Sequence, residues 1–211
     1  MPADGPDETT PFRTREQREA ERVQKREAVL GAAVRAFNAR GFHAASLDEV
    51  ATSLHISKPT IYHYLGNKEA VLLECVTRGL EMLQAAADAA GDIPGSGLDR
   101  LCQFLRRYAE INMGDFGRCV IRTADEMLSA EGARRFRELK GQIDQSMRSL
   151  IEAAIADRSM KPVDVRIAAF TFAGALNWPA RWYDPHGPMA PDAIARAMVD
   201  LLICGVSRNA G

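Results

Sequence analysis

Lysine, threonine, tyrosine and histidine side chains gather on one face of the short segment 58–65. If the segment is helical, Ile61 and Leu65 point to a core and the polar side chains remain outside. Such side chains donate hydrogen bonds to phosphate oxygens and to base edges, so the chemistry indicated is recognition of DNA. The outer side chains are Lys58, Thr60, Tyr62 and His63.

A first short helix is predicted directly before this segment, beginning after Ser46. Ser46 and Glu49 have the spacing of a capping box, in which each side chain bonds to the backbone N–H of the other residue. His55 follows where the chain must reverse, and histidine is enriched in left-handed backbone. The apolar face of this first helix consists of Leu47, Val50, Ala51 and Leu54.

The second helix is predicted to begin after Ser57, whose side chain can cap it, with Pro59 in its first turn. Asn67 is predicted to cap a third helix that begins at Lys68. Two helices joined by a tight turn are typical of a helix-turn-helix, which lays its second helix in the DNA major groove. Ser46 and Lys68 stand at helix N-termini, where we expect them to hold phosphate groups.

The string from Ser57 to Val71 resembles the TetR family of bacterial one-component regulators. It reads Ser-Lys-Pro-Thr-Ile-Tyr-His-Tyr-Leu-Gly-Asn-Lys-Glu-Ala-Val. His55 departs from the family pattern, which usually has glycine at this turn. The upstream residues that match the same pattern are 37–42 (Phe-Asn-Ala-Arg-Gly-Phe), Ser46 and the pair Val50-Ala51.

The resemblance implies an all-α fold of about nine helices. An N-terminal three-helix head would bind DNA, and a C-terminal helical body would bind a ligand and dimerise. The residues agree with an all-helical fold, because no segment shows strand-like alternation; the chain also has no internal repeats. We expect a disordered tail over residues 1–13, a DNA-binding domain over 14–68, and a ligand-binding and dimerisation domain over 69–211.

The N-terminal helix is predicted to run from Thr14, which can form a capping box with Gln17, to Arg40. Its early turns, residues 15–26, are densely charged, and two interpretations stay open for them. They either reach phosphates beside the helix-turn-helix or form a solvated helical extension.

Six further helices are predicted from apolar periodicity after the helix-turn-helix. They are separated by a glycine- and proline-rich linker at 91–97, a break at 114–117 and an aromatic, proline-interrupted segment at 177–187. The predicted ranges are about 68–90, 98–113, 118–128, 132–159, 163–176 and 191–206.

The charge of the chain is unevenly distributed, although its net charge is only −1 over 211 residues. Residues 11–70 hold ten lysines and arginines against seven acids, a net charge of +3. A mildly basic head on a nearly neutral body indicates localised phosphate contact rather than general affinity for nucleic acid.

The four cysteines, Cys75, Cys102, Cys119 and Cys204, have no CxxC spacing and lie in apolar helical patterns. Buried free thiols are one interpretation and a redox switch is the other. The first residues are acidic and polar, which is unlike a signal peptide, and no apolar run approaches the ~20 residues of a membrane span. We therefore expect a cytoplasmic protein with no membrane partner.

The helices predicted at 163–176 and 191–206 carry few charges and many small residues. The family resemblance implies that they form the four-helix bundle of a homodimer, whose two-fold symmetry suits a palindromic double-stranded operator. The alternative is that both helices belong to the internal core.

By resemblance, the body holds a small-molecule effector, with no cofactor and no metal. The alternative for each candidate residue is an ordinary core position. The candidates are the aromatic, methionine and polar residues expected to face inward, together with one arginine: Phe104, Tyr108, Met113, Phe116, Arg122, Met127, Phe170, Asn177 and Trp178.

The segment 176–188 is similar to the C-terminal segment of TetR regulators that respond to acyl-CoA thioesters. Arginine charge and an indole ring suit the phosphates and adenine of CoA, although the same residues would also suit a loop stapled to the dimer interface. The residues concerned are Arg118, Arg122, Arg181 and Trp182.

The sequence thus predicts a homodimeric repressor released from its operator by an effector, which an acyl-CoA thioester would fit. The alternative is a DNA-binding dimer that has no small-molecule effector and either responds to cysteine oxidation or acts constitutively. An enzyme is disfavoured, because the sequence contains no metal-ligand cluster, phosphate-cradling glycine loop or Gly-x-Ser-x-Gly elbow.

Overall fold

The structure is a computed structural model that describes residues 14–204. Within this range the chain forms ten α-helices, one 3-10 turn and no strand. Nine of the helices have seven or more residues and α9 is a single turn, so the prediction of an all-α fold with about nine helices is confirmed. The tail expected at 1–13 and the last two residues of the final predicted helix lie outside the described residues.

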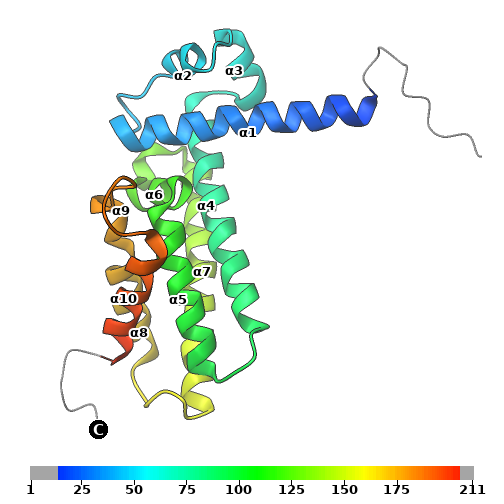
Figure 1. Ribbon diagram of the computed structural model, residues 1–211. Helices are drawn as coiled ribbons and strands as arrows, with labels where there is room; N and C mark the ends of the chain where they lie inside the picture. Colours follow the sequence, from blue (N-terminus) through cyan, green and yellow to red (C-terminus); the bar gives the residue numbers. More distant parts are fainter. Residues whose placement is uncertain (1–13, 205–211) are drawn as a thin grey trace, which may run out of the picture.

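Three helices form the head: α1 (Arg15–Arg40), α2 (Leu47–Ser53) and α3 (Lys58–Leu65). Figure 1 shows α1 lying across one end of the body, with α2 and α3 stacked on its outer side. Their apolar faces close a small core, in which Val34 and Ile61 are fully buried. The left-handed backbone predicted for His55 is confirmed by its φ of 55°, and it turns the chain from α2 into α3.

The remaining helices form an elongated body in which α4, α5 and α7 run along the long axis (Figure 1). Helices α8 and α10 cover one side of this bundle, and α6 fills the end nearest α1. The elements are α4 (Lys68–Gly91), α5 (Gly97–Met113), α6 (Asp115–Arg122), a 3-10 turn (Asp125–Met127), α7 (Ala130–Ala156), α8 (Val165–Asn177), α9 (Pro179–Trp182) and α10 (Pro191–Cys204).

The helix predicted over 118–128 is wrong at both ends. Only Gly114 interrupts the chain, since its extended backbone ends α5 and the next helix begins at once at Asp115. Thr123 then adopts an extended conformation, which ends α6 and leaves only the 3-10 turn before α7. The short α6 therefore crosses the body between α1 and α4.

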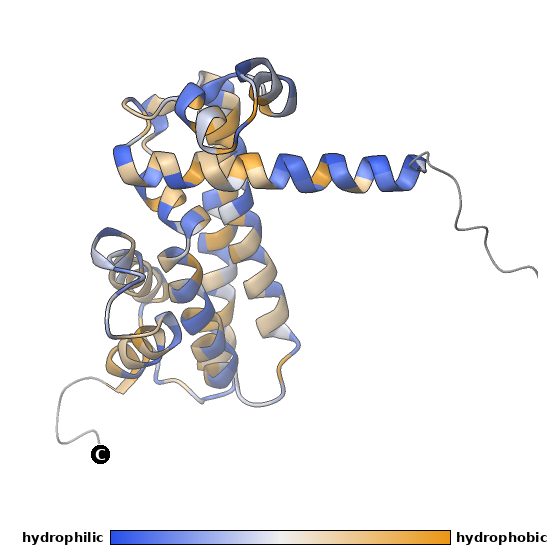
Figure 2. Ribbon diagram, turned by 45° about the horizontal axis from the view of Figure 1, so that its top comes forward, coloured by the Kyte–Doolittle hydropathy of each residue, from blue (hydrophilic) through white to orange (hydrophobic). Residues whose placement is uncertain are grey.

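The N-terminal half of α1 projects beyond the body, and Figure 2 shows that its outer turns are mostly hydrophilic. The Thr14–Gln17 capping box predicted at its start is confirmed by bonds of 3.2 Å and 2.9 Å. Further along, Arg26 of α1 pairs with Glu74 of α4 at 2.5 Å, and Glu27 pairs with Arg78 at 2.5 Å. The projecting turns are solvated, and the helix joins α4 only where these ion pairs begin.

Helices α4 and α6 cross in close contact at Gly79. A Cβ atom at this position would lie 2.6 Å from Cγ2 of Val120 and 2.7 Å from the carbonyl oxygen of Phe116. Backbone cannot yield as a flexible side chain does, so only glycine permits this approach.

We therefore expect Gly79→Ala to destabilise the protein by about 1–3 kcal/mol, because the methyl group must push α4 and α6 apart. Gly141→Ala is the matched control, since a Cβ there meets nothing within 4 Å in the middle of α7. The control should stabilise the protein by up to ~1 kcal/mol through helix propensity. Urea unfolding of both variants measures this, and equal stabilities would contradict the close crossing.

Candidate DNA interface and effector cavities

The outer face of α3 presents the polar side chains that the sequence assigned to DNA. Tyr62 is 44% exposed, and Lys58 and His63 are exposed beside it. Ile61 and Leu65 are buried on the opposite side of the helix and fix its orientation on the head. A helix placed in this way can enter a major groove with its polar face foremost.

Lys58 does not stand free on this face. Its Nζ lies 2.7 Å from Oδ2 of Asp48 in the first turn of α2. The hydrogen bond and charge of Asp48 raise the pKa of Lys58 above its ordinary value. A carboxylate therefore lies within the candidate DNA interface, where it would compete with a DNA phosphate for the lysine.

The capping predicted for Ser46 and Ser57 is wrong in its details. Ser46 Oγ accepts from the backbone N–H of Asp48 at 3.2 Å, and Glu49 pairs with Arg40 of α1 instead of completing a capping box. Ser57 makes no capping bond, because its Oγ and that of Thr60 are hydrogen-bonded to each other at 2.7 Å. Both serines still stand at the N-terminal ends of α2 and α3, where backbone N–H groups face outward.

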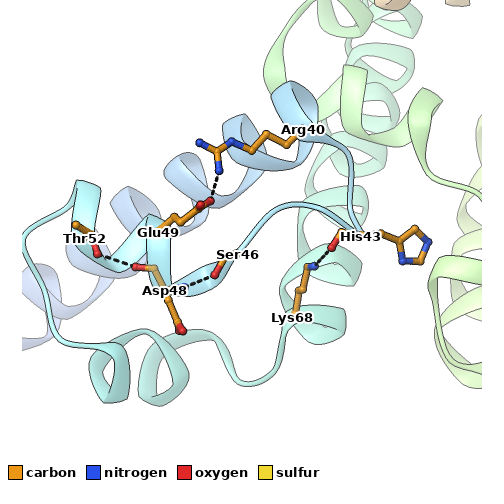
Figure 3. A network of polar contacts seen from close by, with 7 residues as sticks. All are labelled: Arg40, His43, Ser46, Asp48, Glu49, Thr52 and Lys68. Atoms are coloured by element: carbon orange, nitrogen blue, oxygen red, sulfur yellow. Dashed lines mark hydrogen bonds and ion pairs between the residues drawn. The ribbon is translucent and has the colours of Figure 1, made fainter.

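Lys68 ties the start of α4 to the loop between α1 and α2. Its Nζ donates to the carbonyl oxygen of His43 at 3.0 Å and lies 4.8 Å from the ring centroid of Phe42. Figure 3 shows this contact together with the Arg40–Glu49 and Ser46–Asp48 contacts. Lys68 is thus a structural tie in this state, which sequence reasoning did not identify.

A cavity of about 380 Å³ opens in the body, walled by α4, α5, α6, α7 and α8. We call it the body cavity. Its polar centre is Asn177, whose Oδ1 accepts from the Tyr108 hydroxyl at 2.9 Å and from Nδ2 of Asn112 at 3.0 Å. Its lining residues are Leu80, Leu83, Tyr108, Val120, Ile121, Thr123, Lys140, Ile143, Asp144, Met147, Phe170, Ala173 and Asn177.

Three of the nine predicted ligand residues, Tyr108, Phe170 and Asn177, meet in the body cavity. Phe104 and Met113 lie in the packed core, and Phe116 packs against that core. Trp178 is 64% exposed and lies outside the cavity. Sequence reasoning did not assign Lys140, Asp144 and Met147 to a cavity, because the apolar spacing of α7 is the same for a core and for a cavity wall.

The two remaining candidates, Arg122 and Met127, line a second cavity of about 250 Å³. We call it the junction cavity, because its walls come from the end of α1 in the head and from α6 and α9 in the body. Thr123 lines both cavities. The other lining residues of the junction cavity are Phe37, Asn38, Gly41, Phe42, Leu72, Cys119 and Arg181.

Arg122 bridges the two parts of the molecule in this junction cavity. Its Nη1 donates to the carbonyl oxygen of Asn38 in α1 at 2.6 Å. Burial, followed by the charges of Arg118 and Arg181, lowers the pKa of Arg122. Part of the contact between head and body is therefore made by Arg122, which lies near the positive charges of Arg118 and Arg181.

One side of the body leaves apolar side chains uncovered. Ile167 of α8 is 62% exposed and Leu201 of α10 is 53% exposed. A groove of about 650 Å³ runs between these helices, with Ile167, Phe172 and Leu202 in its walls. An apolar face of this kind is typical of a protein interface.

The cysteines differ in burial. Cys75 of α4 and Cys119 of α6 are buried, whereas Cys102 is half-buried and Cys204 is exposed. A hydrogen bond with Cys119, together with burial, raises the pKa of the Cys75 thiol. Since the thiolate is the reactive form, Cys75 is held in its unreactive state.

Residues 14–204 contain no group of three or more His, Cys, Asp or Glu side chains that could hold a metal ion. Over the same range, no helix is long and apolar enough to cross a membrane.

Two family models match the chain. The model described as "Bacterial regulatory proteins, tetR family" matches residues 29–75, and the model described as "Tetracyclin repressor-like, C-terminal domain" matches residues 94–206. The first covers the helix-turn-helix and the second covers slightly more than half of the chain, including most of the residues that line the two cavities.

Individual relatives agree with these models. An HTH-type transcriptional repressor, KstR2 of Mycolicibacterium smegmatis, is 23% identical over 200 residues, which is 90% of this chain and 94% of that protein. The crystal structure of the TetR family regulator PfmR from Thermus thermophilus aligns with a TM-score of 0.78 and 28% identity, over 85% of this chain and 99% of that one. AibR in complex with isovaleryl coenzyme A and operator DNA aligns with a TM-score of 0.74 and 23% identity, over 85% and 98% of the two chains.

We expect Asp48→Asn to raise DNA affinity about threefold, because it removes a carboxylate from the interface and frees Lys58 for phosphate. The slope of log affinity against log salt should steepen by up to ~1. Fluorescence anisotropy on a duplex selected from a random library measures both quantities. Asp92→Asn, at the far end of α4, is the matched control and should change neither. A loss of affinity in Asp48→Asn would instead mean that the ion pair orients Lys58 for binding.

Proposed function

The chain belongs to the TetR family of transcriptional regulators, and on this premise we propose that it is a homodimeric repressor released from a palindromic operator by a small-molecule effector. The observation that carries the proposal is the position of α4. Its first residue, Lys68, is tied to the head loop at His43, while Leu80 and Leu83 wall the body cavity. A ligand in this cavity would contact α4, and because α4 begins in the head, the ligand could favour one position of the head over another.

For the DNA complex we propose that Lys58, Tyr62 and His63 enter the major groove from α3. Tyr62 is as well suited to phosphate as to a base edge. Ser46, Ser57, Thr60 and Lys68 would hold the phosphate backbone around them, which requires Lys68 to share its ammonium group with the His43 carbonyl. The functional domains are then residues 14–68 and 69–211, and access to chromosomal DNA places the protein in the cytoplasm.

We propose that the apolar face of α8 and α10 is the dimer interface. Two heads must sit about 34–36 Å apart, or a multiple of this spacing, to read successive half-sites on one side of the duplex. The exposed Ile167 and the adjacent groove supply apolar surface that a second copy can cover.

Ile167→Asp should therefore shift the protein from dimer to monomer and abolish tight operator binding, because a buried unpaired carboxylate is costly at an interface. Size-exclusion chromatography with light scattering measures the mass. Met82→Asp is the control, since Met82 is also an exposed apolar residue but lies on α4, away from α8 and α10 (Figure 1). If the Ile167→Asp variant is still dimeric, the interface lies on another face of the protein.

An acyl-CoA thioester is the effector that we propose. The body cavity is mainly apolar, has hydrogen-bonding groups at Tyr108 and Asn177, and is large enough for a small acyl group. AibR, a structural neighbour, was solved with isovaleryl coenzyme A and operator DNA. Outside the body cavity, the charge of Arg181 and the half-exposed ring of Trp182 can bind the phosphates and stack on the adenine of CoA.

The alternative of a dimer that responds to cysteine oxidation has less support. Cys75 and Cys119 are buried, and the raised pKa of Cys75 keeps its thiol protonated. Alkylation of the exposed Cys204 tests this alternative, with the mass of the alkylated protein as the control because Cys204 also lines the proposed dimer groove. A change in the DNA affinity of an alkylated protein that is still dimeric, with no response to any thioester, would favour it.

A thermal-shift screen against short, long and ring-bearing CoA thioesters tests the effector. A thioester at 100 times its dissociation constant adds about 2.7 kcal/mol of stability, which should raise the melting temperature by about 5–10 °C. Free CoA and the free acids are the controls. The same thioester should release the protein from its operator in an anisotropy assay, and the absence of any shift across the panel would contradict an acyl-CoA effector.

A further inference from the structure

Two arginines line the junction cavity, a third lies near them, and no carboxylate lines the cavity. Arg122 and Arg181 line the cavity, and Arg118 lies close enough for its charge to act on Arg122. Nowhere in residues 14–204 does an acid form an ion pair with any of the three. Like charges gathered in a partly desolvated site repel one another, so the cluster is unfavourable until an anion joins it.

Unused hydrogen-bond donors point to the same conclusion. The Nε atoms of Arg118 and Arg122 are buried and have no partner among the described residues. A buried guanidinium donor without an acceptor costs more than an ordinary unmade hydrogen bond. Phosphate oxygens match the planar fork of arginine in both charge and geometry.

The acceptor that Arg122 does use is a helix end. Asn38 lies in the last turn of α1, where carbonyl groups lack an intrahelical partner, and Arg122 Nη1 caps its carbonyl at 2.6 Å. The side chain of Asn38 also donates to the backbone carbonyl of Asp115 in α6 at 2.8 Å. These two bonds hold the end of α1, and with it the head, on α6.

We propose that the junction cavity binds a phosphate or diphosphate group of the effector, and that this anion takes Arg122 away from the Asn38 carbonyl. Thr123 lines both cavities, so they are adjacent, and on this proposal one extended ligand spans them past the Thr123 side chain. The acyl group then occupies the body cavity, and the phosphate group breaks the hydrogen bond between Arg122 and the Asn38 carbonyl that holds the head on α6. The identity of this ligand rests on the proposed function, whereas the anion site itself does not.

Three probes distinguish the anion site from the acyl-CoA proposal. They are isovaleryl-CoA, isovaleryl-pantetheine, which lacks the phosphates, and inorganic diphosphate. We expect isovaleryl-CoA to bind at least tenfold more tightly than isovaleryl-pantetheine, and diphosphate alone to bind and raise the melting temperature. Arg122→Gln should abolish the diphosphate response and the advantage of CoA over pantetheine, without weakening pantetheine binding. Arg107→Gln, an exposed arginine paired with Glu110, is the matched control and should behave as wild type.

Arg181→Gln provides a second variant on the exposed side of the cavity, in case Arg122→Gln does not fold, and it should weaken diphosphate binding. If diphosphate binds and no thioester does, the anion site stands and the acyl-CoA proposal fails. If isovaleryl-CoA binds wild type and Arg122→Gln equally well and diphosphate does not bind, the anion site is refuted while the acyl-CoA proposal stands.

The switching step has its own readout. Without any ligand, Arg122→Gln should bind the operator about fivefold more weakly than wild type, because the Asn38 carbonyl has lost its charged cap. Adding diphosphate should weaken operator binding by wild type and leave that of the variant unchanged. Operator binding that is insensitive to both the substitution and diphosphate would refute the switch.

Discussion

The packing of α6 against α1 and α4 at the same time is the constraint on which the arrangement of head and body depends. On the α4 side, Gly79 lets the two backbones approach so closely that no side chain fits between them. On the α1 side, the end of the helix is held through Asn38 and Arg122. Helix α6 also forms part of the wall of both cavities. A ligand bound in either cavity would therefore contact a short helix that packs against both α1 and α4.

The ion pairs between α1 and α4 indicate how such a change would travel. Arg26–Glu74 and Glu27–Arg78 join the two helices where they cross, and Lys68 fastens the loop that follows α1. Each exposed pair contributes only about 0–1 kcal/mol, but together with the apolar contacts of Val29 and Leu30 they make α1 follow α4. Under the proposed mechanism the head would move as one body with α4, and α3 would follow without contacting the ligand.

Local patterns were sufficient to predict much of this molecule. The capping box at Thr14, the left-handed His55 and the polar face of α3 depend on residues a few positions apart, and the structure has them as expected. The capping box at Ser46 does not form because Glu49 pairs with Arg40, which lies nine residues before it. The junction of Arg122 with Asn38 joins residues 84 positions apart, and no local pattern signals such a contact. The α7 wall of the body cavity was missed for a related reason, since α7 shows the same apolar spacing whether a cavity or packed side chains lie opposite it.

If Lys58 contacts DNA as proposed, the Asp48–Lys58 ion pair would affect how fast the protein searches a chromosome. Non-specific binding depends on the number of phosphates that are neutralised, so a lysine already occupied by a carboxylate lowers the residence time on random sequence. Only a groove that offers Lys58 a better-placed acceptor would gain enough free energy to separate the ion pair. The ion pair would thereby lower the affinity for all DNA while favouring rapid scanning and discrimination of the true operator.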